Sequence, residues 1–183
     1  MSTLPKSLLL LLPLLGLLAG CATVSRAPIP TVPRVDLPRF MGDWYVIAHI
    51  PTFIERDAYD AVESYALAPD GTIATTFTFR AGAHDGPAKR YTPRGFVRDR
   101  ANNSTWGMQF VWPVKAEFLI ASLDAGYTQT IIARNARDYV WIMARTPQIP
   151  EADYARHVEQ LKAWGYDVTK LRRVPHTSRP AGR

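Results

Sequence analysis

The chain has 183 residues, 47% hydrophobic and 21% charged, and its last ~140 residues suffice for one domain with a core but not for two. Its formal net charge of +6 suits anionic lipid head groups as well as an ordinary solvated surface. A single cysteine excludes a disulfide within the folded body, and without a helix-turn-helix, zinc-finger or aromatic RNA-binding motif we expect no nucleic-acid binding.

The N-terminus has the layout of a secretory signal peptide. Lys6 precedes an apolar run from Leu8 to Ala19, and small residues lead into Cys21. The run is shorter than the ~20 apolar residues that span a bilayer, and Pro13 and Gly16 interrupt it. We therefore expect residues 1–20 to be a signal peptide that is removed.

The sequence Leu18-Ala19-Gly20-Cys21 resembles the lipobox of bacterial lipoproteins. The resemblance implies cleavage before Cys21 and acylation of its thiol, and two or three acyl chains would anchor the protein durably where one is marginal. Ala22, in place of an aspartate, implies sorting to the outer membrane, on its periplasmic face. A buried thiol without a lipid is the alternative interpretation of Cys21.

Prolines are dense after the cysteine, at positions 28, 30, 33 and 38. Such density favours an extended, semi-rigid spacer. We therefore predict a lipidated N-terminus and proline-rich linker over residues 21–39, a domain over residues 40–174 and a flexible tail over residues 175–183.

The domain is rich in β-forming segments with hairpin-length connections. Pro69-Asp70-Gly71 forms the turn between two runs within residues 59–82. The other segments are residues 44–50, 89–100, 104–114, 116–124, 128–135 and 138–145. These eight predicted strands are typical of an up-and-down antiparallel sheet, which must close into a barrel or leave its edges exposed.

One helix follows the strands. Pro150 stands where its first turn would begin, Glu151 and Asp153 favour the N-terminal end, and Gly165 can cap the other end. An apolar stripe predicts that this helix packs on the outside of the barrel. Residues 166–174 could add a short ninth strand.

Two motifs resemble lipocalin signatures. "GDWYVIA" (42–48) is similar to the Gly-x-Trp element that opens the lipocalin barrel, and "RDYVWIMARTP" (137–147) resembles the later Asp-Tyr and Arg-x-Pro elements. With the lipobox, the chain resembles the bacterial lipocalins. The resemblance implies an all-β fold: an eight-stranded up-and-down antiparallel lipocalin barrel with one C-terminal helix outside. The signature residues carried over are Gly42, Trp44, Asp138, Tyr139 and Arg145.

The resemblance also implies roles. Trp44 would plug the closed end of the barrel under a cation–π contact from Arg145, and both roles are structural. The partner would be a fatty acid or lysophospholipid, carried by an outer-membrane lipoprotein that is held to the membrane through lipidated Cys21. No cofactor, metal or catalytic residue is implied, and a homodimer is left open.

Strand alternation selects candidate ligand-binding residues, because an eight-stranded barrel encloses room for packed side chains or for one small ligand. The inward faces are apolar and aromatic, which suits an acyl chain. With Phe53 from the loop 51–59, the candidates are Phe53, Tyr65, Phe77, Phe79, Met108, Phe110, Trp112, Phe118 and Ile120. The alternative is that these residues simply fill the core.

Two charged residues stay open to interpretation. Glu63 shares its strand face with Tyr65 and Leu67, so it either looks into the barrel or lies exposed near the rim, and the cost of a buried carboxylate favours the rim. Arg56 in the loop 51–59 either binds a ligand carboxylate or phosphate, or lies exposed without a specific role.

The sequence offers little support for catalysis. It contains no G-x-S-x-G, H-E-x-x-H or phosphate-binding glycine motif, and its four histidines are scattered. We therefore expect a lipid carrier that is not an enzyme. The alternative is an envelope scaffold with a filled barrel, acting through protein partners.

Overall fold

The computed structural model describes residues 26–177. The predicted signal peptide, Cys21 and the last residues of the predicted tail lie outside this range. Within it, neither α-helix has the length and apolar character needed to cross a bilayer.

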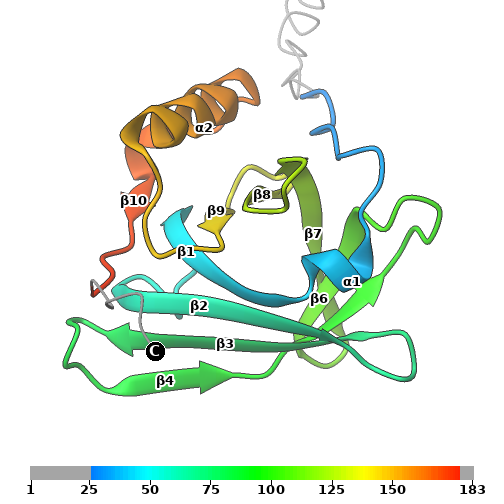
Figure 1. Cartoon of the computed structure of the whole chain (residues 1–183), viewed down its shortest axis with the longest axis horizontal. Coiled ribbons are helices and arrows are strands. Elements are labelled where there is room, and N and C mark those ends of the chain that lie inside the picture. The colour runs from blue at the N-terminus through cyan, green and yellow to red at the C-terminus, as the bar shows by residue number, and fades with distance from the viewer. Residues whose placement is uncertain (1–25, 178–183) are drawn as a thin grey trace, which may run out of the picture.

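The described residues form one antiparallel sheet with short helices before and after it (Figure 1). The helical elements are α1 (Leu37–Phe40), α2 (Glu151–Ala163) and the 3₁₀ helix η1 (Val168–Lys170). The strands are β1 (Gly42–Ile50), β2 (Ala58–Leu67), β3 (Ile73–Ala81), β4 (Ala88–Tyr91), β5 (Arg94–Val97), β6 (Thr105–Val111), β7 (Val114–Leu123), β8 (Gln129–Ala133), β9 (Val140–Ala144) and β10 (Arg172–Arg173).

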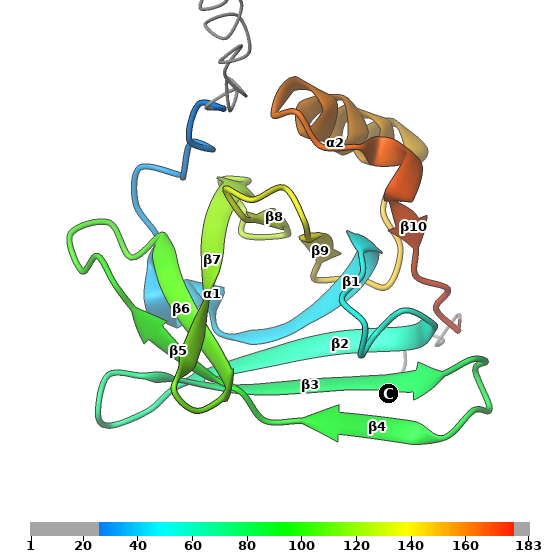
Figure 2. The same cartoon turned by 180° about the vertical axis from the view of Figure 1, so that it is seen from behind.

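Strand β1 closes the sheet into a barrel, because it pairs with β2 and also with β9. The ring runs β1-β2-β3-β5-β6-β7-β8-β9 and back to β1. The predicted eight-stranded barrel with one helix outside is therefore confirmed (Figures 1 and 2). The loops after β1, β3, β6 and β8 form the open end, and α1 lies at the closed end.

The predicted strand over residues 89–100 is two strands. Both β4 and β5 pair with β3, and they are separated at Thr92 and Pro93. Proline has no backbone N–H to donate to the hydrogen-bond ladder of the sheet, so the strand is interrupted at Pro93. Beyond the break, β5 continues the ring by pairing with β6, whereas β4 extends the sheet alongside β3.

Alternation along the strands produces two apolar clusters on the two faces of the sheet. The interior cluster contains Trp44 and Val46, and the exterior cluster contains Ile47, Leu161 and Tyr166. At a register shift between Val46 and Ala48, the alternation of β1 is interrupted, and Ile47 and Ala48 both belong to the exterior cluster. Helix α2 covers the exterior cluster through Leu161, which is fully buried.

The segment predicted as a spacer packs against the barrel where it is described. Ile29 and Val35 are buried, and the amide of Val32 donates to the carbonyl of Ile120 at 3.0 Å. The prolines keep residues 26–36 extended, but the apolar residues between them bind the segment to the barrel as a strap. The segment is thus extended, as the proline density predicts, but over residues 26–39 it packs on the barrel instead of only spacing the domain from Cys21.

The predicted tail is also attached at its start. The ring of His176 hydrogen-bonds the carbonyl of Val46 at 2.8 Å, and the amide of Thr177 donates to Asp60 at 2.7 Å. Strand β10 precedes these contacts and pairs with Ala48 and His49 of β1. The C-terminal segment thus covers part of β1 that β2 leaves unpaired.

The closed end is organised around Arg145. Its guanidinium lies 3.8 Å from the centroid of the Trp44 ring, and the indole of Trp44 donates to the carbonyl of Phe40 at 2.8 Å. Gly42 adopts φ +91°, a backbone conformation that favours glycine, and an added Cβ atom would lie 3.4 Å from the guanidinium of Arg145. At distances of 2.7 to 3.3 Å, Arg145 also donates to the carbonyls of Arg39, Phe40, Met41, Asp43 and Tyr127.

We expect Arg145→Lys to destabilise the fold by about 3 kcal/mol, because a lysine ammonium cannot reproduce the planar fork that serves these carbonyls. Urea unfolding followed by circular dichroism would measure the loss. Arg94→Lys is the matched control, because its ion pair with Asp70 is exposed and screened by water, so the exchange should change the stability little. Equal small losses in both variants would contradict a central role for Arg145.

Candidate functional site

The closed half of the barrel interior is filled by aromatic side chains. The rings of Trp106 and Phe118 stack at 5.2 Å, and Phe40 lies 5.0 Å from Trp44 and 5.7 Å from Tyr65, measured between ring centroids. These five residues pack against one another and fill this half of the interior, so the space for a ligand lies in the open half.

The open half holds a cavity of about 340 Å³. Its wall is largely apolar, and its volume lies in the range of small-molecule sites. The apolar residues of the wall come from the β1–β2 loop and from strands on opposite sides of the barrel: Phe53, Ile54, Phe77, Pro93, Met108, Phe110, Val111, Ala116, Phe118 and Trp141. The interior is therefore part core and part cavity.

Five of the nine predicted ligand-binding residues line this cavity: Phe53, Phe77, Met108, Phe110 and Phe118. Three others are buried elsewhere in the interior cluster. Tyr65 belongs to the closed-end aromatic group, Phe79 stacks on Tyr91 at 6.2 Å, and Ile120 is fully buried beside the strap.

The predicted inward position of Trp112 is wrong. The residue lies in the turn between β6 and β7, and 83% of its surface is exposed. The pairing of β6 with β7 changes register between Met108 and Val111, so the neighbouring residues Phe110 and Val111 both line the cavity and simple alternation no longer places Trp112. Leu67, which alternation places inward at the end of β2, is also exposed.

Glu63 faces the cavity rather than the rim. It lies on the cavity wall and accepts a hydrogen bond from the hydroxyl of Tyr65. Burial raises the pKa of Glu63 to about 7, the Tyr65 contact opposes this rise, and the charge of Glu55 adds to it. Strand parity could have found this position, but the expected cost of burial favoured the rim. Protonation reduces that cost.

Glu55 is a cavity residue that the sequence did not single out. Its carboxylate accepts from the amide of Thr52 at 3.0 Å and from the indole of Trp141 at 3.2 Å, and it lies 3.6 Å from the ring of His49. Burial opposes ionisation, but the contacts with His49, Thr52 and Trp141 together lower the pKa of Glu55. The carboxylate thereby holds the β1–β2 loop over the mouth.

Arg56, in the same loop, is exposed and lies outside the set of described residues that line the cavity. Its backbone carbonyl accepts a hydrogen bond from Arg172. The geometry thus provides no contact between the Arg56 side chain and the cavity wall.

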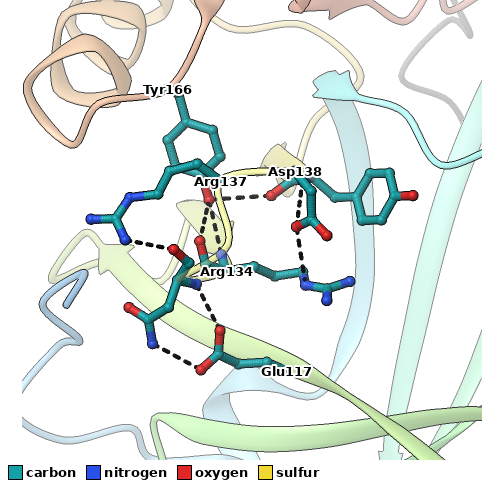
Figure 3. A network of polar contacts seen from close by, with 7 residues as sticks. Glu117, Arg134, Arg137, Asp138 and Tyr166 are labelled. Atoms are coloured by element: carbon teal, nitrogen blue, oxygen red, sulfur yellow. Dashed lines mark hydrogen bonds and ion pairs between the residues drawn. The ribbon is translucent and has the colours of Figure 1, made fainter. Parts of the chain in front are cut away.

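A polar network fixes the mouth on the side of β7 and the β8–β9 turn (Figure 3). The two carboxylate oxygens of Glu117 accept from the backbone amide and the side-chain amide of Asn135 at 2.7 and 2.8 Å. Arg134 pairs with Asp138 at 3.3 Å, and the hydroxyl of Tyr166 accepts from the amide of Arg134. The predicted signature residue Asp138 therefore lies at the mouth, far along the barrel from Arg145.

Tyr139 follows Asp138 in this network. Its carbonyl accepts from the Tyr166 hydroxyl at 3.2 Å, and the Arg134 guanidinium lies 5.3 Å from its ring centroid. Residues 26–177 contain no cluster of three or more His, Cys, Asp or Glu side chains arranged to hold a metal ion.

The family model for a lipocalin-like domain matches residues 35–176 of this sequence. The chain belongs to the lipocalin family. Lipocalins bind small hydrophobic ligands, in keeping with an apolar cavity that opens at one end of the barrel. The match begins at Val35, so it includes α1 and the last residues of the strap.

Relatives of this lipocalin include a plant protein and bacterial proteins. Temperature-induced lipocalin-1 of Arabidopsis thaliana is 29% identical over 161 residues, covering 81% of this chain and 83% of that protein. Outer membrane lipoprotein Blc of Escherichia coli strain K12 is 25% identical over 168 residues, covering 88% and 94%. The solved structure of insecticyanin from Manduca sexta matches with a TM-score of 0.64 at 14% identity, covering 84% and 87%, and supports the fold.

We expect Glu63→Gln to remove a pH dependence from the stability of this lipocalin. Between the ordinary carboxyl pKa of 4.5 and the folded pKa of about 7, Glu63 is protonated in the folded chain and ionised in the unfolded chain. Its contribution to stability is therefore present at low pH and is lost as the pH rises through 7. The variant, whose amide can still accept from Tyr65, lacks this loss.

Urea unfolding of both proteins at pH 5 and pH 8 would test this prediction. The difference between their free energies of unfolding should change by about 2 kcal/mol between the two pH values, in favour of the variant at pH 8. Glu159→Gln, on the exposed face of α2, should behave as the wild type does. Parallel pH profiles for wild type and Glu63→Gln would contradict the assignment.

Proposed function

We propose that this lipocalin is a lipid carrier, anchored in the outer membrane, that holds one fatty acid or lysophospholipid in its barrel for lipid storage or transport in membrane maintenance. The observation that carries the proposal is the apolar cavity in the open half of the barrel. An acyl chain gains about 0.8 kcal/mol for each buried CH₂ group, so such a wall favours lipid tails.

The arrangement of polar groups favours a tail-first orientation. The deeper wall is apolar apart from Glu63, whereas Glu117 and Arg134 lie at the mouth with hydrogen bonds and an ion pair. A ligand head group at the mouth would remain hydrated and within reach of these polar side chains. A head group at the aromatic floor would lose its water without a comparable set of partners.

The sequence supports the anchor. Leu18-Ala19-Gly20-Cys21 resembles a lipobox, and Escherichia coli Blc, a relative over most of the chain, is named an outer membrane lipoprotein. Periplasmic orientation and acylation of Cys21 are part of the same proposal. Ordinary binding proteins of this kind need no catalytic groups, and we propose none here.

The decisive experiment uses the chain from residue 22, which contains every element of the described fold. Native mass spectrometry and lipid extraction would identify a co-purified ligand, and titration with lysophospholipid and oleate would follow tryptophan fluorescence. We expect saturable binding of about one lipid per barrel. Absence of binding up to the solubility limit of both lipids would overturn the carrier proposal and favour the filled-barrel scaffold.

We expect Ala116→Trp to block lipid binding, because the residue lies on the cavity wall and a large side chain there would occupy the ligand volume. The affinity should fall by about tenfold or more in the same titration. Ala74→Trp is the matched control, since Ala74 is exposed on the outer face of β3. Unchanged lipid affinity in Ala116→Trp would show that the ligand does not occupy this cavity.

A further inference from the structure

Five large apolar side chains are exposed at the open end of the barrel, and we call them the mouth patch: Phe53, Phe110, Val111, Trp112 and Val114. Four belong to the β6–β7 hairpin and one to the β1–β2 loop. Trp112 is 83% exposed and Phe110 50% exposed. Single exposed apolar residues are ordinary on protein surfaces, but a group of this size at one end of a molecule marks a binding surface.

The patch is continuous with the entrance to the cavity. Phe53, Phe110 and Val111 line the cavity and are also exposed. Of the large apolar residues exposed in the described chain, Leu67 alone lies away from the mouth, at the closed end of β2. The same end of the barrel therefore carries both the ligand entrance and nearly all the exposed apolar side chains.

The strap begins at this end too. Arg137 donates to the carbonyl of Ala27, and the amide of Ile29 donates to the side chain of Asn135 at 2.8 Å. Both partners belong to the β8–β9 turn at the open end. From there the strap (blue in Figure 2) runs along the outside of the barrel to α1 at the closed end.

Glu117 connects the start of the strap with the mouth patch. It follows Val114 by three residues on β7, and it holds Asn135 through both carboxylate oxygens. Asn135 in turn accepts from Ile29. Through Glu117 and Asn135, whose contact belongs to the network of Figure 3, strand β7 of the hairpin is joined to the beginning of the strap.

Four residues lie between Cys21 and Arg26, and the five residue-to-residue steps from Cys21 to Arg26 span at most about 17 Å. An anchor at Cys21 would accordingly keep this rim close to the bilayer surface, where a tethered patch meets lipid at high effective concentration. Aromatic side chains such as Trp112 are favoured at the level of the lipid head groups.

We propose that the mouth patch inserts into the head-group region of the membrane that holds the anchor, so that the cavity opens onto the bilayer. The orientation relative to the membrane rests on the proposed anchor, whereas the affinity of the patch for lipid does not. A second copy of the chain is a poorer occupant, because five side chains fall short of the 20–30 residues that each partner contributes to a standard interface.

The test measures co-sedimentation of the chain from residue 22 with vesicles of phosphatidylethanolamine and phosphatidylglycerol. We expect the double variant Val111→Ser/Trp112→Ser to bind at least about tenfold more weakly than the wild type. Leu67→Ser, which removes an exposed leucine (47% exposed) from the closed end, is the matched control and should bind as the wild type does. Because all the replaced side chains are exposed, the variants should keep the wild-type melting temperature.

A second measurement locates the contact. Lipids brominated on the acyl chain near the head group should quench the fluorescence of vesicle-bound wild type, and Trp112→Phe should bind while losing most of that quenching. The proposal is overturned if the wild type does not bind vesicles, or if the double variant binds equally well. It is also overturned if sedimentation velocity shows a wild-type dimer that the double variant abolishes, since the patch would then be covered by a second copy.

These outcomes separate the docking surface from the carrier function. If the double variant loses vesicle binding while no protein binds lysophospholipid or oleate, docking stands and the carrier proposal fails. If the lipids bind saturably but vesicle binding does not depend on the patch, the carrier proposal stands and docking fails.

Discussion

The pairing of β1 with β9 is the contact on which the rest of the structure depends. It turns an open sheet into a closed barrel, and closure gives the two faces of every strand different environments. One face packs under α2, and the other encloses the interior. In an open sheet the aromatic stripe would simply be core. In the closed barrel, its residues in the open half form the wall of a cavity.

Arg145 holds the closed end of the barrel together. Its guanidinium joins carbonyls from α1, from the start of β1 and from the turn before β8, and it covers Trp44. The aromatic group beneath it fills the closed half. At the open end, polar side-chain contacts hold the loops. Glu55 of the β1–β2 loop accepts from Trp141, and Glu117 of β7 accepts from Asn135 of the β8–β9 turn. Packing thus stabilises one end, and polar contacts shape the other.

The sequence predicted the parts of this molecule that follow from local pattern. Alternation and turn residues located the strands, and the two motifs located Trp44 and Arg145, which lie in contact. Alternation failed for Trp112 because the register shift in β6 comes from pairing with β7. The break between β4 and β5 follows from Pro93, which cannot donate to the ladder, and the strap packs because apolar residues lie between its prolines.

Glu55 could not be found locally, because its partners His49 and Trp141 meet it through the fold. The position of Glu63 followed from parity, but its charge state required the structure.

The two buried carboxylates explain how an apolar cavity tolerates charge. Contacts at the mouth lower the pKa of Glu55, so that it stays ionised where polar neighbours stabilise it. Burial, opposed by the Tyr65 contact and aided by the charge of Glu55, raises the pKa of Glu63 to about 7, so below that pH the deeper wall is neutral. With Glu55 ionised and Glu63 protonated, the negative charge lies at the mouth and not on the deeper wall. An acyl chain is least compatible with a charge deep in the cavity, so this arrangement suits a ligand that enters tail first. An anionic head group would then depend on the basic side chain of Arg134, and on lipid or water outside the mouth, rather than on the cavity floor.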